Sequence, residues 1–263
     1  MFAILNVTPD SFSDGGDFAG TAEAIGRGIE LHEQGADIVD VGGESTRPGA
    51  ARVAVDEEQS RVIPVIRGLV KAGVPVSVDT MNAGTALAAA EAGASVINDV
   101  SGGLADPDMY GVVAKTGLLY IAMHWRGHST DMATLASYDD VVLDVRAELK
   151  ARLAEMIVWG IDMNQVVLDP GLGFAKTGEH NWQLLARLDE LASLGHPLLI
   201  GASRKRFLGP LLPADATMPE RDLPTAVVSA LAARSVWALR VHDVPSTRAA
   251  LGVWTAWQNG LKQ

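Results

Sequence analysis

The stretch VVLDPGLGFAKTGEHN, residues 166–181, contains the pattern on which the fold prediction depends. Its first three residues are apolar and predict a short buried strand, which ends in the carboxylate of Asp169. The glycine-rich loop that follows is not a phosphate-binding loop, because Ala175 stands where such a loop needs a glycine before its lysine. A carboxylate at the strand end would also repel a phosphate. The stretch therefore predicts a strand, a loop and a helix, and it raises the question of what Asp169 holds.

The same unit, a short apolar run that ends in a polar or glycine residue, recurs along the chain. The runs are FAILNV (2–7), DIVDVG (37–42), VPVSVD (74–79), SVIND (95–99), LLYIAM (118–123), VVLDPG (166–171), PLLIGAS (197–203) and ALRVHD (238–243). Each is rich in Val, Ile or Leu and too short to indicate a helix, so each predicts a strand. Near-continuous apolar strands are typical of a parallel sheet that helices cover.

Longer segments with helical spacing lie between these runs. Residues 55–71 open with the capping pattern Asp56-x-x-Gln59 and contain Pro64, at which we expect a kink. Residues 140–159 predict a second long amphipathic helix. The expected buried positions are Val62, Ile66 and Leu69 in the first helix, and Val142, Val145, Leu149, Leu153 and Met156 in the second.

Eight strand-and-helix units in 263 residues predict an α/β fold, a single (β/α)8 TIM barrel with the active site at the C-terminal ends of the strands. We expect one domain over residues 1–263. A doubly wound open sheet is the alternative, but it needs only six strands, and no G-x-G-x-x-G motif opens the first helix. Residues 210–224, PLLPADATMPERDLP, predict a mobile excursion after the seventh strand.

Composition limits the classes of partner. The net charge of −11 argues against a nucleic-acid partner, and the absence of cysteine excludes disulfides and thiolate chemistry. The first residues, MFAILNVTPD, lack the basic start of a signal peptide, and no apolar run is long enough to span a membrane. These features predict a soluble cytoplasmic protein without a membrane partner.

Polar side chains follow the predicted strands, where a barrel carries its chemistry. They are Asn6, Asp40, Asp79, Asn98, His124, Asp169, Lys205, Arg240 and His242. One such residue alone would more simply cap a loop, but a whole ring of them is hard to explain by capping.

Two chemical sets are present in this ring. Asp79, Asn98 and Asp169 suit a flat heterocycle with several N–H donors, because a buried carboxylate can accept two parallel hydrogen bonds. The cations Arg47, Lys205, Arg240 and His242 indicate an anion site, most simply for a phosphate ester. A solvated basic turn is an equally good explanation of SRKR at 203–206 when it is taken alone.

Three further loops have alternative explanations. TPDSFSDGGDFAG (8–20) and GGESTRPGAARV (42–53) are either flexible surface loops or mobile lids that place Phe12 and Pro48 over a second substrate. His124 and His128 have the spacing of a helical zinc site. They follow a strand directly, however, and lack the accompanying glutamate, so we expect no metal there.

Taken together, these motifs resemble the dihydropteroate synthase family. ILNVTPDSFSDGG, DIVDVGGESTRPGA, VSVDT, VINDVSGG, LDPGLGFAKT, GASRKRFLG and RVHDV occur in the order and spacing of that family between residues 4 and 244. The resemblance implies an enzyme, a transferase of folate biosynthesis and of the class that sulfonamides target. It would join 6-hydroxymethyl-7,8-dihydropterin pyrophosphate to para-aminobenzoate, giving 7,8-dihydropteroate and pyrophosphate.

The resemblance also implies roles for particular residues. Asp79, Asn98, Asp169 and Lys205 would hold the pterin, Asn6 would bind Mg²⁺, and Thr46, Arg47, Arg240 and His242 would bind pyrophosphate. Phe12, Pro48, Phe174 and Ser203 would border the aminobenzoate pocket. Asp79, Asp169, Lys205 and Asp14 would be the catalytic residues. Arg240 and His242 would stand at the start of the last helix, whose N-terminus favours anions.

The implied mechanism is dissociative. Pyrophosphate leaves first, helped by Mg²⁺ and the cations, and carboxylates stabilise the cation that remains on the pterin methylene. The neutral arylamine then attacks without a strong base. The family also implies a homodimer, in which Trp254 and Trp257 are either interface or core residues.

One departure from the family and two alternative functions stand beside this prediction. MHWRGHS (123–129) carries Trp125 and lacks a proline that the family commonly has, which bears on fine specificity. A methyltetrahydrofolate–corrinoid methyltransferase would need the same pterin acceptors but no pyrophosphate subsite. A non-catalytic pterin-binding paralogue would be expected to lack Lys205 or Arg47, and both are present.

Overall fold

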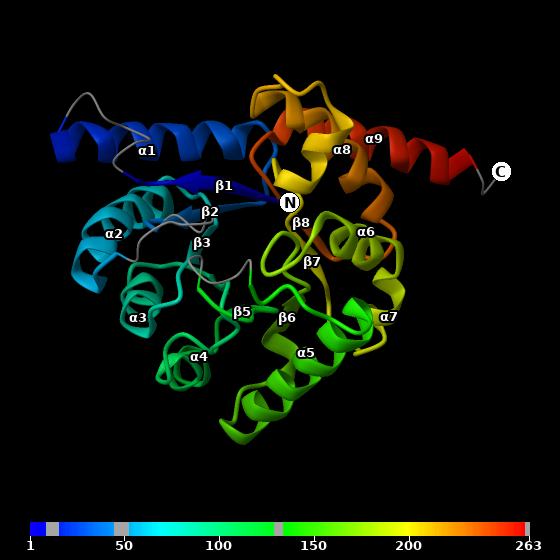
Figure 1. The fold of residues 1–263 in the computed structure, drawn as a ribbon. Helices are drawn as coiled ribbons and strands as arrows, with labels where there is room; N and C mark the ends of the chain where they lie inside the picture. Colours follow the sequence, from blue (N-terminus) through cyan, green and yellow to red (C-terminus); the bar gives the residue numbers. More distant parts are fainter. Residues whose placement is uncertain (9–15, 45–52, 129–133, 261–263) are drawn as a thin grey trace.

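Parallel strands form a barrel in the part of the chain that the computed structural model describes, residues 1–8, 16–44, 53–128 and 134–260 (Figure 1). The strands are β1 (Phe2–Asn6), β2 (Ile38–Gly42), β3 (Val76–Asp79), β4 (Val96–Asp99), β5 (Leu119–Met123), β6 (Val166–Asp169), β7 (Leu199–Ile200) and β8 (Ala238–Val241). They pair in the order β6-β5-β4-β3-β2-β1-β8-β7. A parallel bridge from Leu168 to Leu198 joins the two edges of this sheet. The predicted TIM barrel is confirmed.

Helices follow the strands and surround the barrel (Figure 1). They are α1 (Gly16–Glu33), α2 (Val55–Lys71), α3 (Ala83–Glu91), α4 (Met109–Thr116), α5 (Val141–Val158), α6 (Gly178–Ala186), α7 (Leu188–Ala192), α8 (Asp222–Ala232) and α9 (Val244–Gly260). Short 3₁₀ helices are η2 (Met163–Gln165), η3 (Arg206–Leu211) and η4 (Pro219–Arg221). The expected apolar stripes of α2 and α5 are all buried, because they face the sheet.

Alternation along each strand separates two apolar layers. Successive side chains of a strand point to opposite faces, so Val39 and Val41 of β2 join the core between sheet and helices. The other face points into the barrel. There, one residue from each of six strands forms an interior cluster, which we call the barrel plug: Phe2, Val96, Ile121, Val167, Leu199 and Ala238.

The strand register aligns polar positions near the C-terminal ends of the strands. Asn6 pairs with Gly42, Gly42 with Asp79, and Asp79 with Asn98, across β1 to β4. Because these residues share one row of the sheet, their side chains are neighbours at the barrel mouth.

Two sequence predictions about local structure are wrong. The N-cap of α2 is Ala54, and no side chain caps it, so Asp56 and Gln59 lie inside the helix instead of forming a capping pair. Acidic residues still occupy the first turn, where their negative charge interacts favourably with the positive end of the helix dipole. The segment 210–224 is also not a loop throughout, since η3, η4 and the start of α8 occupy much of it.

Candidate active site

Arg240 is the centre of a buried polar cluster at the barrel mouth. Its Nε donates to Asp40 Oδ2 and its Nη2 to Asp79 Oδ2, both at 2.5 Å. Asn98 Nδ2 donates to the same Asp40 oxygen at 3.0 Å. Asp40, Asp79 and Asn98 are buried, whereas the Arg240 side chain is 18% exposed. One guanidinium therefore serves two carboxylates and retains access to the mouth.

Asp169 and Lys205 form a second part of the same mouth. A Cβ placed on Gly201 would lie 4.0 Å from both Asp169 Oδ2 and Lys205 Nζ, and 3.9 Å from Arg240 Cβ. The absence of a side chain at position 201 therefore leaves room in which these groups converge. Asp169 Oδ1 accepts the N–H of Gly171 at 2.7 Å, which orients the carboxylate.

The glycines after Asp169 allow other groups to approach. Gly173 has a φ of +77°, and a Cβ there would lie 2.9 Å from Lys205 Cδ. Gly171 has a φ of +68°, and a Cβ there would overlap the carbonyl oxygen of His124. Lys205 Nζ donates to the Leu172 carbonyl, so the loop holds the ammonium beside Asp169. The glycines thus serve Lys205, and the prediction that this is not a phosphate loop agrees with the geometry.

Burial shifts the pKa values of the mouth. It raises the pKa of Asp79 to about 7, because the nearby Arg240 offsets only part of the desolvation and Asp40 adds negative charge. Burial also raises the pKa of Asp169 against the opposing effect of Lys205. It lowers the pKa of Lys205 to about 8, despite the attraction of Asp169. Burial therefore opposes the charged forms of Asp79, Asp169 and Lys205.

Ser203 and His242 face each other beside this cluster. The backbone N–H of His242 donates to Ser203 Oγ at 3.1 Å, and Ser203 Oγ lies 2.9 Å from His242 Nδ1. A serine oxygen can accept two hydrogen bonds and donate one, so either group can be the donor in the contact with Nδ1. The pair holds the imidazole ring beside the cluster.

The structure changes two expectations about the cations. Arg240 lies inside β8, not at the start of α9, which begins at Val244. The cationic and carboxylate sets are also not separate, since Arg240 pairs with Asp79. Asn6, at the end of β1 and half-buried, lies on the far side of Gly42 from Asp79 in the register.

Several predicted residues lie outside the described part of the chain. They are Phe12, Asp14, Thr46, Arg47 and Pro48. Their roles stay predictions.

His124 is buried in a hydrogen-bonded arrangement of its own. Its Nε2 lies 2.9 Å from Glu148 Oε2, and its Nδ1 lies 2.9 Å from Lys176 Nζ. Burial and the neighbouring Lys176 lower the pKa of His124 to about 4, so the ring is neutral at physiological pH. His128 makes a T-shaped contact with Trp125 instead of joining His124. Across the described ranges, no group of three or more His, Asp or Glu side chains is placed to hold a metal ion.

Sequence reasoning missed three of the buried acids, Asp40, Glu58 and Asp99. Asp40 is one of the predicted strand-end residues but has no predicted role; its position inside an apolar run, two residues before Gly42, is the available signal. Glu58 lies on the apolar stripe of α2 and is 1% exposed. It accepts hydrogen bonds from Thr80 at 2.8 Å, Asn82 at 2.8 Å and Thr85 at 2.6 Å, which fixes the turn directly after Asp79.

Apolar side chains form one wall of the mouth. Met81, Val100 and Met123 are buried together, and Trp125 and Phe174 pack against them. Trp125, the departure from the family pattern, is therefore part of this wall and is half-buried.

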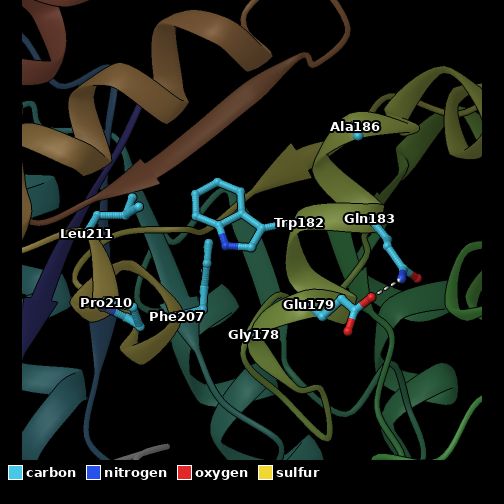
Figure 2. A pocket seen from close by; sticks show the side chains of 8 residues that line it. All are labelled: Gly178, Glu179, Trp182, Gln183, Ala186, Phe207, Pro210 and Leu211. Carbon is cyan, nitrogen blue, oxygen red and sulfur yellow. Dashed lines mark hydrogen bonds between the residues drawn. The ribbon is translucent and has the colours of Figure 1, made fainter.

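A separate groove of about 580 Å³ lies on the outside of the molecule, between α6 and η3 (Figure 2). Trp182 and Phe207 meet in it edge to face, with ring centroids 5.1 Å apart. No predicted site residue lines this groove, and it does not connect to the chemistry of the mouth.

Comparison with known proteins defines first the class and then the family. A model of the family described as pterin binding enzymes matches residues 2–242, so the chain is a pterin-binding enzyme. The dihydropteroate synthase of Mycobacterium leprae is 50% identical over 98% of this chain and 93% of that protein. The chain belongs to the dihydropteroate synthase family and catalyses dihydropteroate synthesis.

Solved structures agree with this assignment. The dihydropteroate synthase of Xanthomonas albilineans with 4-aminobenzoic acid has a TM-score of 0.91 and 44% identity, over 98% of this chain and 92% of that one. The same organism's enzyme in complex with 7,8-dihydropteroate has a TM-score of 0.87 and 41% identity, with the same coverage. The methyltransferase and non-catalytic alternatives are therefore set aside. In the described residues, every helix is too short or too polar to cross a membrane.

Proposed function

We propose that Asp79, Asn98, Asp169 and Lys205 bind the pterin ring of the substrate. The support is their convergence at the mouth: the two carboxylates and the amide are buried, and the half-buried Lys205 places its ammonium beside Asp169. Asp169 keeps one carboxylate oxygen on the Gly171 N–H, and its second oxygen points into the space beside Gly201. A pterin offers an amino group and a ring N–H side by side, which suits a carboxylate acceptor. This would be what Asp169 holds.

Arg240 and His242 are proposed to bind the pyrophosphate of the same substrate. The Arg240 guanidinium contacts Asp79 and remains partly exposed at the mouth. A planar guanidinium binds phosphate oxygens in pairs, and the His242 imidazole beside it is a further hydrogen-bonding group. Thr46 and Arg47 would complete this subsite from the loop after β2.

Mg²⁺ would be held by Asn6 together with substrate oxygens. The structure fits this arrangement: Asn6 presents an amide at the end of β1, and Gly42 beside it leaves open the space that a Cβ would fill next to Asp79. Mg²⁺ commonly uses only one or two protein oxygens and takes the rest from phosphates and water. When bound, it would neutralise charge on the pyrophosphate as the C–O bond breaks.

The residues of the chain then have distinct parts in a dissociative reaction. Arg240 and His242 stabilise the negative charge on the leaving pyrophosphate. Asp79 and Asp169 stabilise the positive charge that spreads from the methylene into the pterin. The aminobenzoate nitrogen attacks that methylene, and Phe174 and Ser203 border its approach. Asp14, Phe12 and Pro48 would act from the loops that lie outside the described residues.

One observation carries this proposal: Arg240 donates to Asp79, a carboxylate proposed to bind the pterin, and its side chain remains partly exposed at the mouth. Arg240→Ala tests it through two ligands measured by calorimetry. The affinity for the pyrophosphorylated pterin should fall about a hundredfold, and a pterin without phosphates should lose clearly less, because that ligand is affected only through the support that Arg240 gives to Asp79. Arg206→Ala, at an exposed arginine of the SRKR segment (203–206), is the control. Equal losses for both ligands would show that Arg240 supports the pterin pocket or the fold instead.

A homodimer is proposed as the assembly. Leu223, Val227 and Leu231 form an exposed stripe along α8, and they are 71%, 50% and 71% exposed. Trp257 on the adjacent α9 is 74% exposed, whereas Trp254 is half-buried. A large exposed apolar surface of this kind is typical of an interface. Light scattering should give the mass of two chains for the wild type and of one chain for Leu231→Asp. The cytoplasmic location stays a prediction.

A further inference from the structure

Two loops at the barrel mouth are tied together by a half-buried lysine. Lys176, in the loop between β6 and α6, places its Nζ 2.9 Å from His124 Nδ1, at the end of β5. The same ammonium donates to the carbonyl of Phe174 at 3.1 Å. One side chain thus fixes the backbone of its own loop and connects it to the neighbouring strand.

The histidine is itself held in one orientation. Glu148 on α5 accepts from His124 Nε2 at 2.9 Å and from Arg126 Nε at 3.1 Å. Burial alone would raise the pKa of Glu148, but the hydrogen bonds from His124 and Arg126 outweigh it and lower the pKa to about 2. With Nε2–H donating to this carboxylate, Nδ1 is the acceptor that faces Lys176.

A second tie joins the same two loops. Tyr138, ahead of α5, donates its hydroxyl to the carbonyl of Ala175 at 3.0 Å. The Arg126 guanidinium lies 3.8 Å above the Tyr138 ring and holds that ring in place. Both ties therefore end on adjacent residues, Phe174 and Ala175.

The tied segment is strained. Ala175 has a φ of +47°, in the left-handed region that a side chain disfavours. A residue in such a conformation persists only where surrounding contacts hold it. Tyr138 supplies such a contact to the carbonyl of Ala175, and Lys176 supplies one to the carbonyl of the preceding residue, Phe174.

The strained turn determines where the Phe174 ring lies. That ring packs on the apolar wall with Trp125 and faces Lys205, whose Nζ is 4.6 Å from the ring centroid. A shift of the turn would move the ring away from both. Phe174 is therefore the point at which the two ties reach the active site.

We propose that Lys176, held by His124 and assisted by Tyr138, is a positioning residue that sets Phe174 against Lys205 and so shapes the aminobenzoate side of the mouth. This inference rests on the proposed role of Phe174 in the aminobenzoate subsite. Lys176 does not touch the reacting atoms. It acts through the backbone that it holds.

Steady-state kinetics of three variants test this role. Lys176→Met keeps an unbranched side chain one atom shorter than lysine but removes both polar ties, and it should raise the KM for para-aminobenzoate about tenfold with a smaller change in kcat. Tyr138→Phe removes only the bond to Ala175 without changing charge, and it should raise the same KM about threefold. Lys150→Met, at an exposed lysine two residues from Glu148, is the control and should leave the KM unchanged.

Phe174→Ala separates this inference from the proposed function. If Phe174→Ala raises the aminobenzoate KM but Lys176→Met and Tyr138→Phe both match the control, the positioning role is wrong and the subsite stands. If Phe174→Ala itself has no effect, the proposed subsite is wrong and the inference falls with it. Should Lys176→Met fail to fold, Tyr138→Phe decides alone.

Pterin affinity and a second-site substitution distinguish the positioning role from a general loss of structure in Lys176→Met. The pterin affinity of Lys176→Met should stay within about threefold of wild type, because Lys205 and Asn98 are untouched. Adding Ala175→Gly, which removes the strain, should return the aminobenzoate KM of Lys176→Met toward wild type. A KM that stays at the Lys176→Met value in the double variant would contradict the positioning account.

Discussion

The two ends of the barrel interior are built from the same strands but differ completely in chemistry. At the N-terminal ends, the barrel plug is apolar and nearly free of solvent contact. At the C-terminal ends, the interior holds Asp40, Asp79, Asp169 and Arg240. The two layers meet directly, since Phe2 of the plug pairs with Arg240 and Ile121 of the plug pairs with Asn98.

This contrast separates stability from function. Burying apolar side chains favours folding, whereas burying charges costs free energy that pairing only partly returns. The raised pKa of Asp79 is a direct expression of that cost. The plug is thus expected to stabilise the barrel that holds the mouth in an unfavourable but reactive arrangement.

The largest effect is expected in the plug. Ile121→Ala leaves a cavity in a fully buried layer and should lower the free energy of unfolding by about 2–5 kcal/mol. Pterin affinity should be nearly unchanged, because the polar row is left intact. Urea denaturation and calorimetry measure the two quantities. A large loss of pterin affinity in a variant that remains folded would mean that the plug also shapes the binding site at the mouth.

Asp169→Asn should give the opposite result at the mouth. It replaces an acceptor by an amide that would face another donor, and pterin binding should weaken by about 3 kcal/mol, roughly a hundredfold. The free energy of unfolding should not fall, since burial of this carboxylate opposes its charge. Near-normal pterin affinity would show that Asp169 is not the recognition group.

The pH dependence of stability tests the cost of the charges. The pKa of Asp79 is raised from 3.8 to about 7 by burial, so the folded protein binds this proton more tightly than the unfolded chain does. The bound proton stabilises the folded state. This contribution is complete below the pKa of Asp79 in the unfolded chain and is lost as the pH rises toward 7. Asp79→Asn should therefore match wild type near pH 4 and exceed its stability by roughly 1–3 kcal/mol at pH 8. Urea titrations at both pH values check this, and a pH-independent difference would contradict it.

The smallest effect concerns the loop that serves Lys205. Gly173→Ala places a side chain at a φ of +77°, and its Cβ would lie 2.9 Å from Lys205 Cδ. The cost in stability should be about 1 kcal/mol, with a loss of pterin affinity of a few fold as Lys205 moves. Gly195→Ala, at a φ of +81° with open space around it, is the matched control for the backbone term. Pterin affinity that falls equally in both variants would mean that Lys205 is not involved.

The sequence by itself determined the order of the strands, the stripes of α2 and α5, and the residues that stand at the strand ends. These features are local: alternation with period two, helical spacing and a polar residue after an apolar run are all contained in short windows. The motifs also sufficed for the family. The predicted N-cap of α2 is wrong because the helix begins at Val55, one residue before Asp56, so that Asp56 lies within the first turn.

Only the tertiary structure decided which of these residues touch. Arg240 reaches Asp40 across 200 positions and Asp79 across 161, and Lys176 reaches His124 across 52. Such pairs depend on the register with which the strands close the barrel, and a local pattern carries no information about that register. The burial that makes Lys176 and Glu58 matter is likewise a property of the closed fold, because it arises only when separate elements pack around them.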